Sequence, residues 1–268
     1  MEMFFYGFMR HAFQASFLIS LIAPILGLFL ILRSQTLLAD TLSHISLVGV
    51  ALGLLLGVSP TWMNLLVVVV ASVLLEYLRS VYKSYSEISI AMMMSGGMAL
   101  ALVLMSFNDN STMSLNNFLF GSIVTITKEQ VLFLFAITLV IILLYLFFKR
   151  PMYVLMFDEE TAFTAGLPIK GMSLAFNIIT GMTIAIMMPI VGALLVAAIL
   201  ILPAAISMRL SKSFNGVILI GILVAMLGMF GGLITSYYVD TPPGATITLL
   251  YLALFFIMML GEKLLKNK

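Results

Sequence analysis

Long apolar stretches separated by short polar breaks occupy most of the chain. Because an α-helix needs about 20 predominantly apolar residues to cross a bilayer, each stretch is a candidate membrane span. Pro189 divides the apolar run at residues 171–208 into two spans joined by a tight turn. The pattern predicts an all-α, polytopic membrane bundle of about eight or nine transmembrane helices, forming one domain over residues 1–268. The expected spans lie near residues 11–32, 36–57, 61–79, 88–107, 129–148, 171–188, 190–209, 214–237 and 244–262.

Composition agrees with a membrane protein, since 63% of the residues are hydrophobic, 9% are charged and the mean hydropathy is +1.21. A typical soluble domain has about 25% charged residues, so that class is excluded. The absence of cysteine excludes disulfides and thiolate metal sites. A net charge of +2 gives no support for nucleic-acid binding. The sequence also has no Gly-x-x-x-x-Gly-Lys-Ser/Thr phosphate loop, so we expect no ATP hydrolysis by this chain itself.

Basic residues are distributed unevenly between the two sides of the predicted spans. Of the 13 lysine and arginine residues, only Arg10 and Lys128 fall on one side. The positive-inside rule makes the other side cytoplasmic, and that side carries the C-terminus. The segment 115–126 is apolar but too short to cross, which predicts an interfacial or re-entrant helix on the outer side.

Asp40 and His44 are the most informative polar residues, because they lie one helical turn apart in a stretch otherwise suited to lipid. Their i, i+4 spacing places both side chains on one helix face. A carboxylate and an imidazole presented together suit a divalent transition metal such as zinc or manganese. Ionisable groups at membrane depth are costly, so a functional role is the default interpretation. Two alternatives stay open: Asp40 as the N-cap of a helix that begins at Thr41, and His44 as a buried hydrogen-bonding histidine.

Two further carboxylates are candidate metal ligands. Glu87 enters its span from the cytoplasmic side at a level similar to Asp40, so Asp40, His44 and Glu87 would meet if the second and fourth spans pack together. A structural pair with Lys83, at i−4, is the alternative for Glu87. Asp240 ends a span at the outer face beside a rigid Thr-Pro-Pro-Gly turn, where we expect a role in metal entry. The alternative is an aspartate that starts the turn through its own backbone hydrogen bond.

The longest cytoplasmic connection, residues 149–170, contains a short predicted helix. Asp158 can cap the start of this helix, and Gly166 ends it. Small residues beside apolar ones make a compact surface suited to a groove on another protein. An amphipathic loop on the membrane surface is the alternative. The residues expected to form the docking element are Asp158, Glu159, Ala162, Gly166 and Leu167.

Five stretches of the chain, in order, resemble the membrane permeases of zinc and manganese ABC importers. They include the segment around Asp40 and His44, the predicted docking helix, and the Asp-Thr-Pro-Pro-Gly sequence that begins at Asp240. This last sequence is more similar to zinc-type members than to manganese-type ones. The stretches lie at residues 30–53, 119–126, 157–167, 189–205 and 236–246.

The resemblance implies a type II ABC importer-like permease in a bacterial cell membrane. It implies a homodimer that docks cytoplasmic ATP-binding subunits and receives its ion from an extracytoplasmic metal-binding protein. Asp40, His44 and Glu87 match the intramembrane polar positions of the family, and the docking helix matches its ATPase-coupling element. The expected function is import of zinc, with a manganese or iron importer of the same family as the alternative. Zn²⁺ or Mn²⁺ would be cargo, and no cofactor is expected to remain bound.

Other readings of the sequence have less support. In a proton-coupled secondary transporter, Asp40 and Glu87 would relay protons, but the sequence lacks an evident pair of broken helices in its two halves. An intramembrane metalloprotease needs a His-Glu-x-x-His motif, which is absent. A purely structural membrane subunit would leave the Asp40 and His44 pair without a reason. The 21 methionines are spread among leucine and isoleucine, which favours apolar packing over a copper path. Glu76 has Arg79 three residues later on the same face, which predicts a structural pair.

Overall fold

The computed structural model describes residues 6–82, 86–107, 111–122, 126–157 and 159–266. All regular secondary structure in these ranges is helical, and eight helices are long and apolar enough to cross a membrane. The predicted all-helical membrane bundle is therefore confirmed. The helices are α1 (Gly7–Leu32), α2 (Thr36–Leu56), α3 (Pro60–Val81), α4 (Ser86–Ser106), α5 (Ser111–Phe120), α6 (Lys128–Phe157), α7 (Glu159–Thr164), α8 (Ile169–Val191), α9 (Val196–Leu210), α10 (Phe214–Val239) and α11 (Pro243–Lys266).

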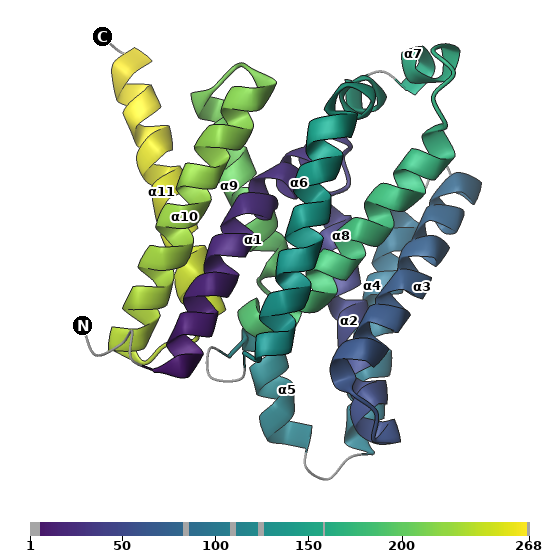
Figure 1. Ribbon diagram of the computed structural model, residues 1–268, viewed down its shortest axis with the longest axis vertical. Coiled ribbons are helices and arrows are strands. Elements are labelled where there is room, and N and C mark those ends of the chain that lie inside the picture. The colour runs from purple at the N-terminus through teal and green to yellow at the C-terminus, as the bar shows by residue number, and fades with distance from the viewer. Residues whose placement is uncertain (1–5, 83–85, 108–110, 123–125, 158, 267–268) are drawn as a thin grey trace.

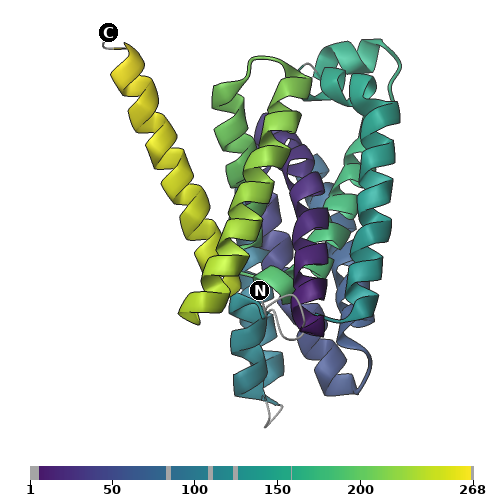
Figure 2. The same cartoon turned by 60° about the vertical axis from the view of Figure 1, so that its left-hand side comes forward.

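The long helices form one bundle, with α7 and the C-terminus at one end and α5 at the other (Figure 1). Helix α1 packs against α6, α9 and α10, while α2 packs against α3, α4 and α8. In the most apolar part of each helix, 78% of the residues are buried in α1 but only 11% in α4. Helix α11 contacts α10 and then diverges from the bundle towards the C-terminus (Figure 2). Helices α1 and α2 thus form the core, whereas α4 and α11 keep faces that the rest of the chain does not cover.

The chain breaks between α8 and α9 at Gly192 and not, as the sequence predicted, at Pro189. Helix α8 continues to Val191, and the expected span at residues 190–209 is the 15-residue α9, which is shorter than a full span. Gly192 has a φ of +97°, a conformation that residues with a Cβ atom rarely adopt. The eight or nine spans expected from the sequence are thus eight long helices and the shorter α9.

A side chain from another helix explains why α8 tolerates Pro189. Proline has no N–H, so the carbonyl of Ala185, four residues earlier, loses its usual helical donor. Asn64 Nδ2 of α3 donates to this carbonyl at 3.0 Å, and Asn64 Oδ1 accepts from Ser46 Oγ of α2 at 2.7 Å. A Cβ atom at Gly49 would lie 2.5 Å from the Asn64 Cα atom, so only glycine allows α2 and α3 to approach this closely. Asn64 therefore joins α2, α3 and α8 inside the bundle.

Helix α5 ends beside the turn that connects α8 and α9. The backbone N–H of Ala193 donates to the Phe118 carbonyl at 2.8 Å, and that of Leu194 donates to the Leu119 carbonyl at 3.2 Å. The predicted short helix in segment 115–126 is confirmed, although it begins earlier, at Ser111, and ends at Phe120. Residues 123–125 of the predicted segment lie outside the described residues. Helix α5 thus closes the end of the bundle opposite α7 (Figure 1).

Candidate metal site and coupling element

Asp40 and His44 both lie inside α2, and both side chains are half-buried. Helix α2 begins at Thr36, and its N-cap position is Gln35. The alternative in which Asp40 caps a helix starting at Thr41 is therefore wrong, because the helix already includes the four residues before Asp40. With an i, i+4 spacing inside a regular helix, the carboxylate and the imidazole share one face of α2. A capping function does not account for Asp40.

One ring nitrogen of His44 is left unpaired within the described part of the chain. Its Nδ1 atom is buried and has no hydrogen-bond partner among the described residues. The neighbouring hydroxyls are already engaged, since Thr41 Oγ1 donates to the Leu37 carbonyl and Ser43 Oγ to the Ala39 carbonyl, each at 2.9 Å. A buried polar atom without a partner is uncommon and costs free energy. The alternative of a hydrogen-bonded core histidine therefore leaves Nδ1 unexplained.

In the single chain, the Glu87 side chain does not form one cluster with Asp40 and His44. Helices α2 and α4 do pack together, as the sequence-based hypothesis required. Thr41 Oγ1 approaches the Ile90 carbonyl of α4 at 3.4 Å, so the contact lies about one turn further along α4 than Glu87. Glu87 is exposed in the first turn of α4, where a carboxylate interacts favourably with the helix dipole. Lys83 lies outside the described residues, so the proposed Lys83 pair is not described either.

The described residues contain no group of three or more His, Cys, Asp or Glu side chains that could hold a metal ion. Within one chain, Asp40 and His44 are therefore a two-residue constellation. Zinc usually takes three or four protein ligands, so a complete site would need further donors. A second copy of the chain is one source of such donors.

A second polar cluster joins α3 to α8. Arg79 NH1 lies 3.8 Å from Glu76 Oε2, which agrees with the structural pair predicted from their spacing. Asn177 Nδ2 of α8 donates to Glu76 Oε2 at 2.6 Å, and Arg79 NH1 donates to Ser173 Oγ at 3.4 Å. Asn177 and Ser173 were not predicted as partners of Glu76 and Arg79, although their spacing of four residues within an apolar span was a signal. These contacts assign Glu76 to helix packing.

The predicted coupling element forms a short helix, α7, at one end of the bundle. Its end is as predicted: Leu167 N–H donates to the Ala162 carbonyl at 3.1 Å and Gly166 N–H to the Phe163 carbonyl at 3.0 Å. These two bonds, with Gly166 at a φ of +74°, make a Schellman termination. Asp158 lies outside the described residues, so its expected capping role is not described, and the side chain of Glu159 is likewise not described.

The surface of α7 differs from the one expected. Ala162 is fully buried against the rest of the chain, whereas the Phe163 side chain is 74% exposed. A buried Ala162 supports the position of α7 from within and offers no surface to a partner. Gly166 is exposed and Leu167 is half-buried. Phe163 is therefore the large apolar side chain that α7 presents outward.

Asp240 terminates α10 in the left-handed conformation, with φ 59° and ψ 41°. Its carboxylate is exposed and forms no hydrogen bond or ion pair with the part of the chain that the structure describes. Ser236 Oγ instead holds the turn by donating to the Thr241 carbonyl at 2.6 Å. The alternative in which the Asp240 side chain organises the turn is therefore not observed. Aspartate is one of the few non-glycine residues that adopt this conformation readily.

Comparison with known proteins places this geometry in a family. Residues 5–262 match the ABC 3 transport family. A probable metal transport system membrane protein of Treponema pallidum (strain Nichols) is 30% identical over 255 residues, which cover 95% of each chain. The high-affinity zinc uptake system membrane protein ZnuB of Haemophilus influenzae is 28% identical over 248 residues, covering 92% of this chain and 95% of ZnuB. Other relatives are named as iron or manganese transport membrane proteins.

A solved structure supports the same relationship. The structure of PsaBC from Streptococcus pneumoniae in complex with Fab contains a chain that is 25% identical and superposes with a TM-score of 0.85. The match covers 96% of this chain and 92% of the other. The sequence match and the shared arrangement of helices both extend over nearly the whole length. The chain therefore belongs to the ABC 3 transport family and is a membrane permease of this family.

Proposed function

We propose that this protein is the transmembrane subunit of an ATP-driven importer of a divalent transition metal ion, with zinc as its cargo. The observation that carries the proposal is the pair on α2, in which the half-buried Asp40 carboxylate shares a helix face with an imidazole whose Nδ1 atom has no partner. A hard oxygen donor and a borderline nitrogen donor suit zinc and manganese. Carboxylate and imidazole ligands hold the ion less tightly than a thiolate cage would, which suits a site that must release it.

A second copy of the chain would complete the ion path. Helix α4 packs beside the part of α2 that carries Asp40 and His44, yet most of α4 is uncovered in the single chain. A twofold axis near α2 would bring two Asp40–His44 pairs together and supply the four ligands that zinc favours. Glu87, at the exposed start of α4, is then positioned near the exit of this path. The homodimer also leaves α7 of each copy free for an ATP-binding subunit.

The partners follow from the same arrangement. On the predicted topology, α7 and the C-terminus are cytoplasmic, and α7 docks a separate ATP-binding subunit. The Asp240 turn and α5 face the outside, where an extracytoplasmic metal-binding protein delivers the ion. ATP-driven closure of the two ATP-binding subunits switches the opening of the path between the two sides of the membrane.

The test is zinc uptake into proteoliposomes that contain the permease, its ATP-binding subunit and its metal-binding protein. Asp40→Asn and His44→Ala should each reduce uptake to the level measured without ATP, because each removes a ligand and leaves the helix intact. Asn caps helices about as well as Asp, so a loss in Asp40→Asn cannot arise from capping. Ser43→Ala is the matched control, since its hydroxyl bonds only to its own helix. Normal uptake by both ligand variants, with normal assembly, would refute the site.

The choice of metal is tested by competition in the same vesicles. The Asp-Thr-Pro-Pro-Gly sequence from Asp240 and the similarity to ZnuB support zinc. Manganese is the second candidate, because a relative is named as a manganese transport protein and the ligand types suit both ions. Unlabelled zinc should suppress uptake of labelled zinc at lower concentration than manganese does. The reverse order would assign manganese as the cargo.

A further inference from the structure

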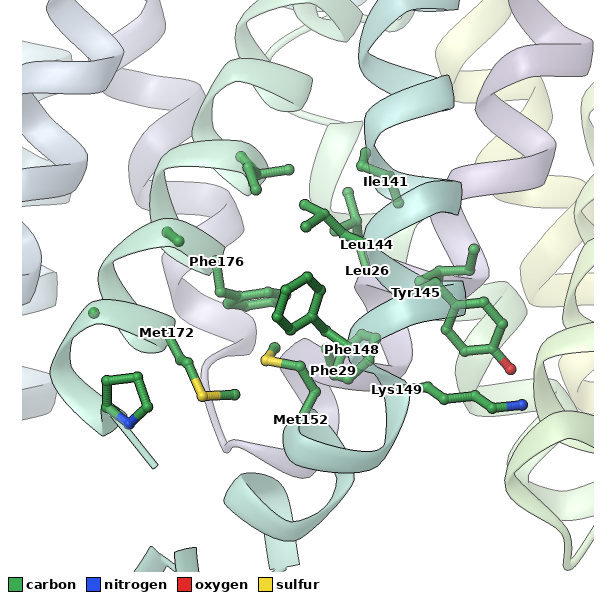
Figure 3. A pocket seen from close by; sticks show the side chains of 15 residues that line it. Leu26, Phe29, Ile141, Leu144, Tyr145, Phe148, Lys149, Met152, Met172 and Phe176 are labelled. Carbon is green, nitrogen blue, oxygen red and sulfur yellow. The ribbon is translucent and has the colours of Figure 1, made fainter. Parts of the chain in front are cut away.

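An apolar cavity of about 280 Å³ lies between α1, α6 and α8 at the end of the bundle near α7. Apart from Lys149 and the Tyr145 hydroxyl, the side chains that line this cavity are apolar, among them Leu26, Phe148 and Phe176 (Figure 3). The space is open on one side, and its lining offers water almost no hydrogen-bond partners. A hydrocarbon chain therefore suits it better than water does.

Lys149 connects the cavity to an adjoining hollow between α6 and the start of α10. Its ammonium group and the Tyr145 hydroxyl point away from the apolar cluster formed by Phe148, Met152 and Phe176 (Figure 3). The stem of Lys149 lines the cavity while its charged end is directed outward, as lysine does at the border between apolar and polar surroundings. Lys149 also lines the adjacent hollow of about 340 Å³. The Lys149 side chain therefore lines both the apolar cavity and the adjoining hollow.

The hollow carries two cationic side chains on an otherwise mixed lining. Lys149 and Arg150 line it together with Tyr153, Asn215 and the apolar Val154 and Phe214. Among the described side chains, no carboxylate lies within 4 Å of the charged groups of Lys149 or Arg150. The first turn of α10, which includes Asn215, adds the positive end of its helix dipole. Two cations without partners and a helix N-terminus therefore face the same space.

The position in the chain selects a lipid as the occupant. Lys149 and Arg150 directly follow the apolar run at residues 130–148, which places them at the level where a span leaves the hydrocarbon core. Basic pockets between transmembrane helices at this level suit the head groups of anionic lipids. A phospholipid joins an anionic phosphate to an acyl chain, which matches a cationic hollow adjoining an apolar cavity. No soluble anion would use both spaces.

We propose that the cavity between α1, α6 and α8 and the hollow at Lys149 and Arg150 form a binding site for one anionic phospholipid. The phosphate lies between Lys149 and Arg150, and an acyl chain enters the cavity beside Phe148. The bound lipid ties α6 to α8 next to α7, which connects these two helices. This site is independent of the Asp40–His44 pair and of the identity of the metal.

The test titrates phosphatidylglycerol and phosphatidylcholine, with identical acyl chains, against the full-length permease in detergent, with binding measured by native mass spectrometry. The wild-type chain should bind one phosphatidylglycerol at least about 10-fold more tightly than phosphatidylcholine, because two cations near the surface favour an anionic lipid. Lys149→Gln/Arg150→Gln should lose this preference. Ala175→Trp, which places an indole in the cavity, should weaken binding of both lipids.

Matched controls separate the site from general effects of charge and bulk. Lys170→Gln/Lys263→Gln removes two exposed cations that line neither space, and Ala136→Trp adds the same bulk to an exposed position on α6. Both controls should keep the wild-type preference. Equal affinity of the wild-type chain for the two lipids would overturn the proposal without any variant. An unchanged preference in Lys149→Gln/Arg150→Gln, or the same loss in the controls, would overturn it as well.

Discussion

Asn64 shows how one side chain can make an unusual backbone possible. It donates to the Ala185 carbonyl, which has no helical donor because residue 189 is proline, and it accepts from Ser46. In the apolar interior of a membrane protein, an unpaired carbonyl is costly because no water is available to replace the missing donor. The Asn64 amide therefore satisfies α8 and at the same time fixes α2 and α3 against it.

We predict that Asn64→Leu lowers the free energy of unfolding by about 1–3 kcal/mol, the cost of leaving a buried polar group unpaired. The measurement is chemical denaturation of the purified permease in detergent. Pro189→Ala restores an N–H to α8 that can reach the Ala185 carbonyl. In the Pro189→Ala background, Asn64→Leu should therefore cost clearly less. An equal cost in both backgrounds would show that the asparagine does not compensate for the proline.

Asp240 supports a second prediction at this scale. Because its carboxylate is exposed and free of hydrogen bonds in the described part of the chain, Asp240→Asn should keep the left-handed turn while removing the charge. We expect a higher metal concentration for half-maximal uptake and an unchanged maximal rate. Thr235→Ala, which removes an exposed hydroxyl one turn before the same helix end, is the control. Unchanged uptake by Asp240→Asn at limiting metal would exclude a role in ion entry.

At the scale of the element, the sequence predicted the spans well because hydropathy is a local property of about 20 residues. The limits of α2, α3, α4 and α10 fall within a few residues of those expected. The sequence-based prediction put the break between α8 and α9 at Pro189 instead of Gly192. The hydrogen-bond donor that lets α8 continue past Pro189 comes from Asn64, more than 100 residues away in sequence, so the local pattern could not reveal it.

The candidate site was predictable to a similar extent. The i, i+4 spacing of Asp40 and His44 follows from helix geometry alone, so the sequence placed them on one face. Whether Glu87 lies beside Asp40 and His44 depends on how α4 is offset along α2. The burial of Ala162 likewise depends on how α7 packs against the helices next to it. Such packing offsets have no signature in a single sequence. The element as a whole is therefore easier to predict than the contact between elements.

The exposed face of α7 gives the prediction at this scale. Phe163 is 74% exposed, so Phe163→Ala removes an apolar anchor without leaving a cavity in the permease. We expect the ATP-binding subunit to co-purify in clearly lower yield, because large apolar side chains at the centre of an interface carry much of its binding energy. ATP-driven metal uptake should fall together with the yield of co-purified ATP-binding subunit. Phe107→Ala, at an equally exposed phenylalanine beyond the end of α4, is the control. Wild-type co-purification by Phe163→Ala would exclude this residue as the anchor.

At the scale of the whole molecule, the two ends of the bundle differ in charge and in structure. The end with α7 and the C-terminus carries most of the lysine and arginine residues that the structure describes, while the opposite end carries α5 and the turn between α8 and α9. Basic segments are retained in the cytoplasm during insertion, so the charge distribution predicts that the α7 end of the permease faces the cytoplasm. Import through the proposed path requires this direction, since ATP is available only in the cytoplasm.

The chain contains no cysteine, so the direction can be measured with single introduced cysteines and a membrane-impermeant thiol reagent on intact cells. Asn116→Cys, at an exposed position of α5, should react without permeabilisation. Thr164→Cys, at the exposed end of α7, should react only after the membrane is opened, because α7 must face the cytoplasm to meet an ATP-binding subunit. The unmodified chain is the control and should not react at all. Labelling of Thr164→Cys in intact cells would show that the permease has the opposite orientation. In that case α7 would face the outside and could not be the coupling element.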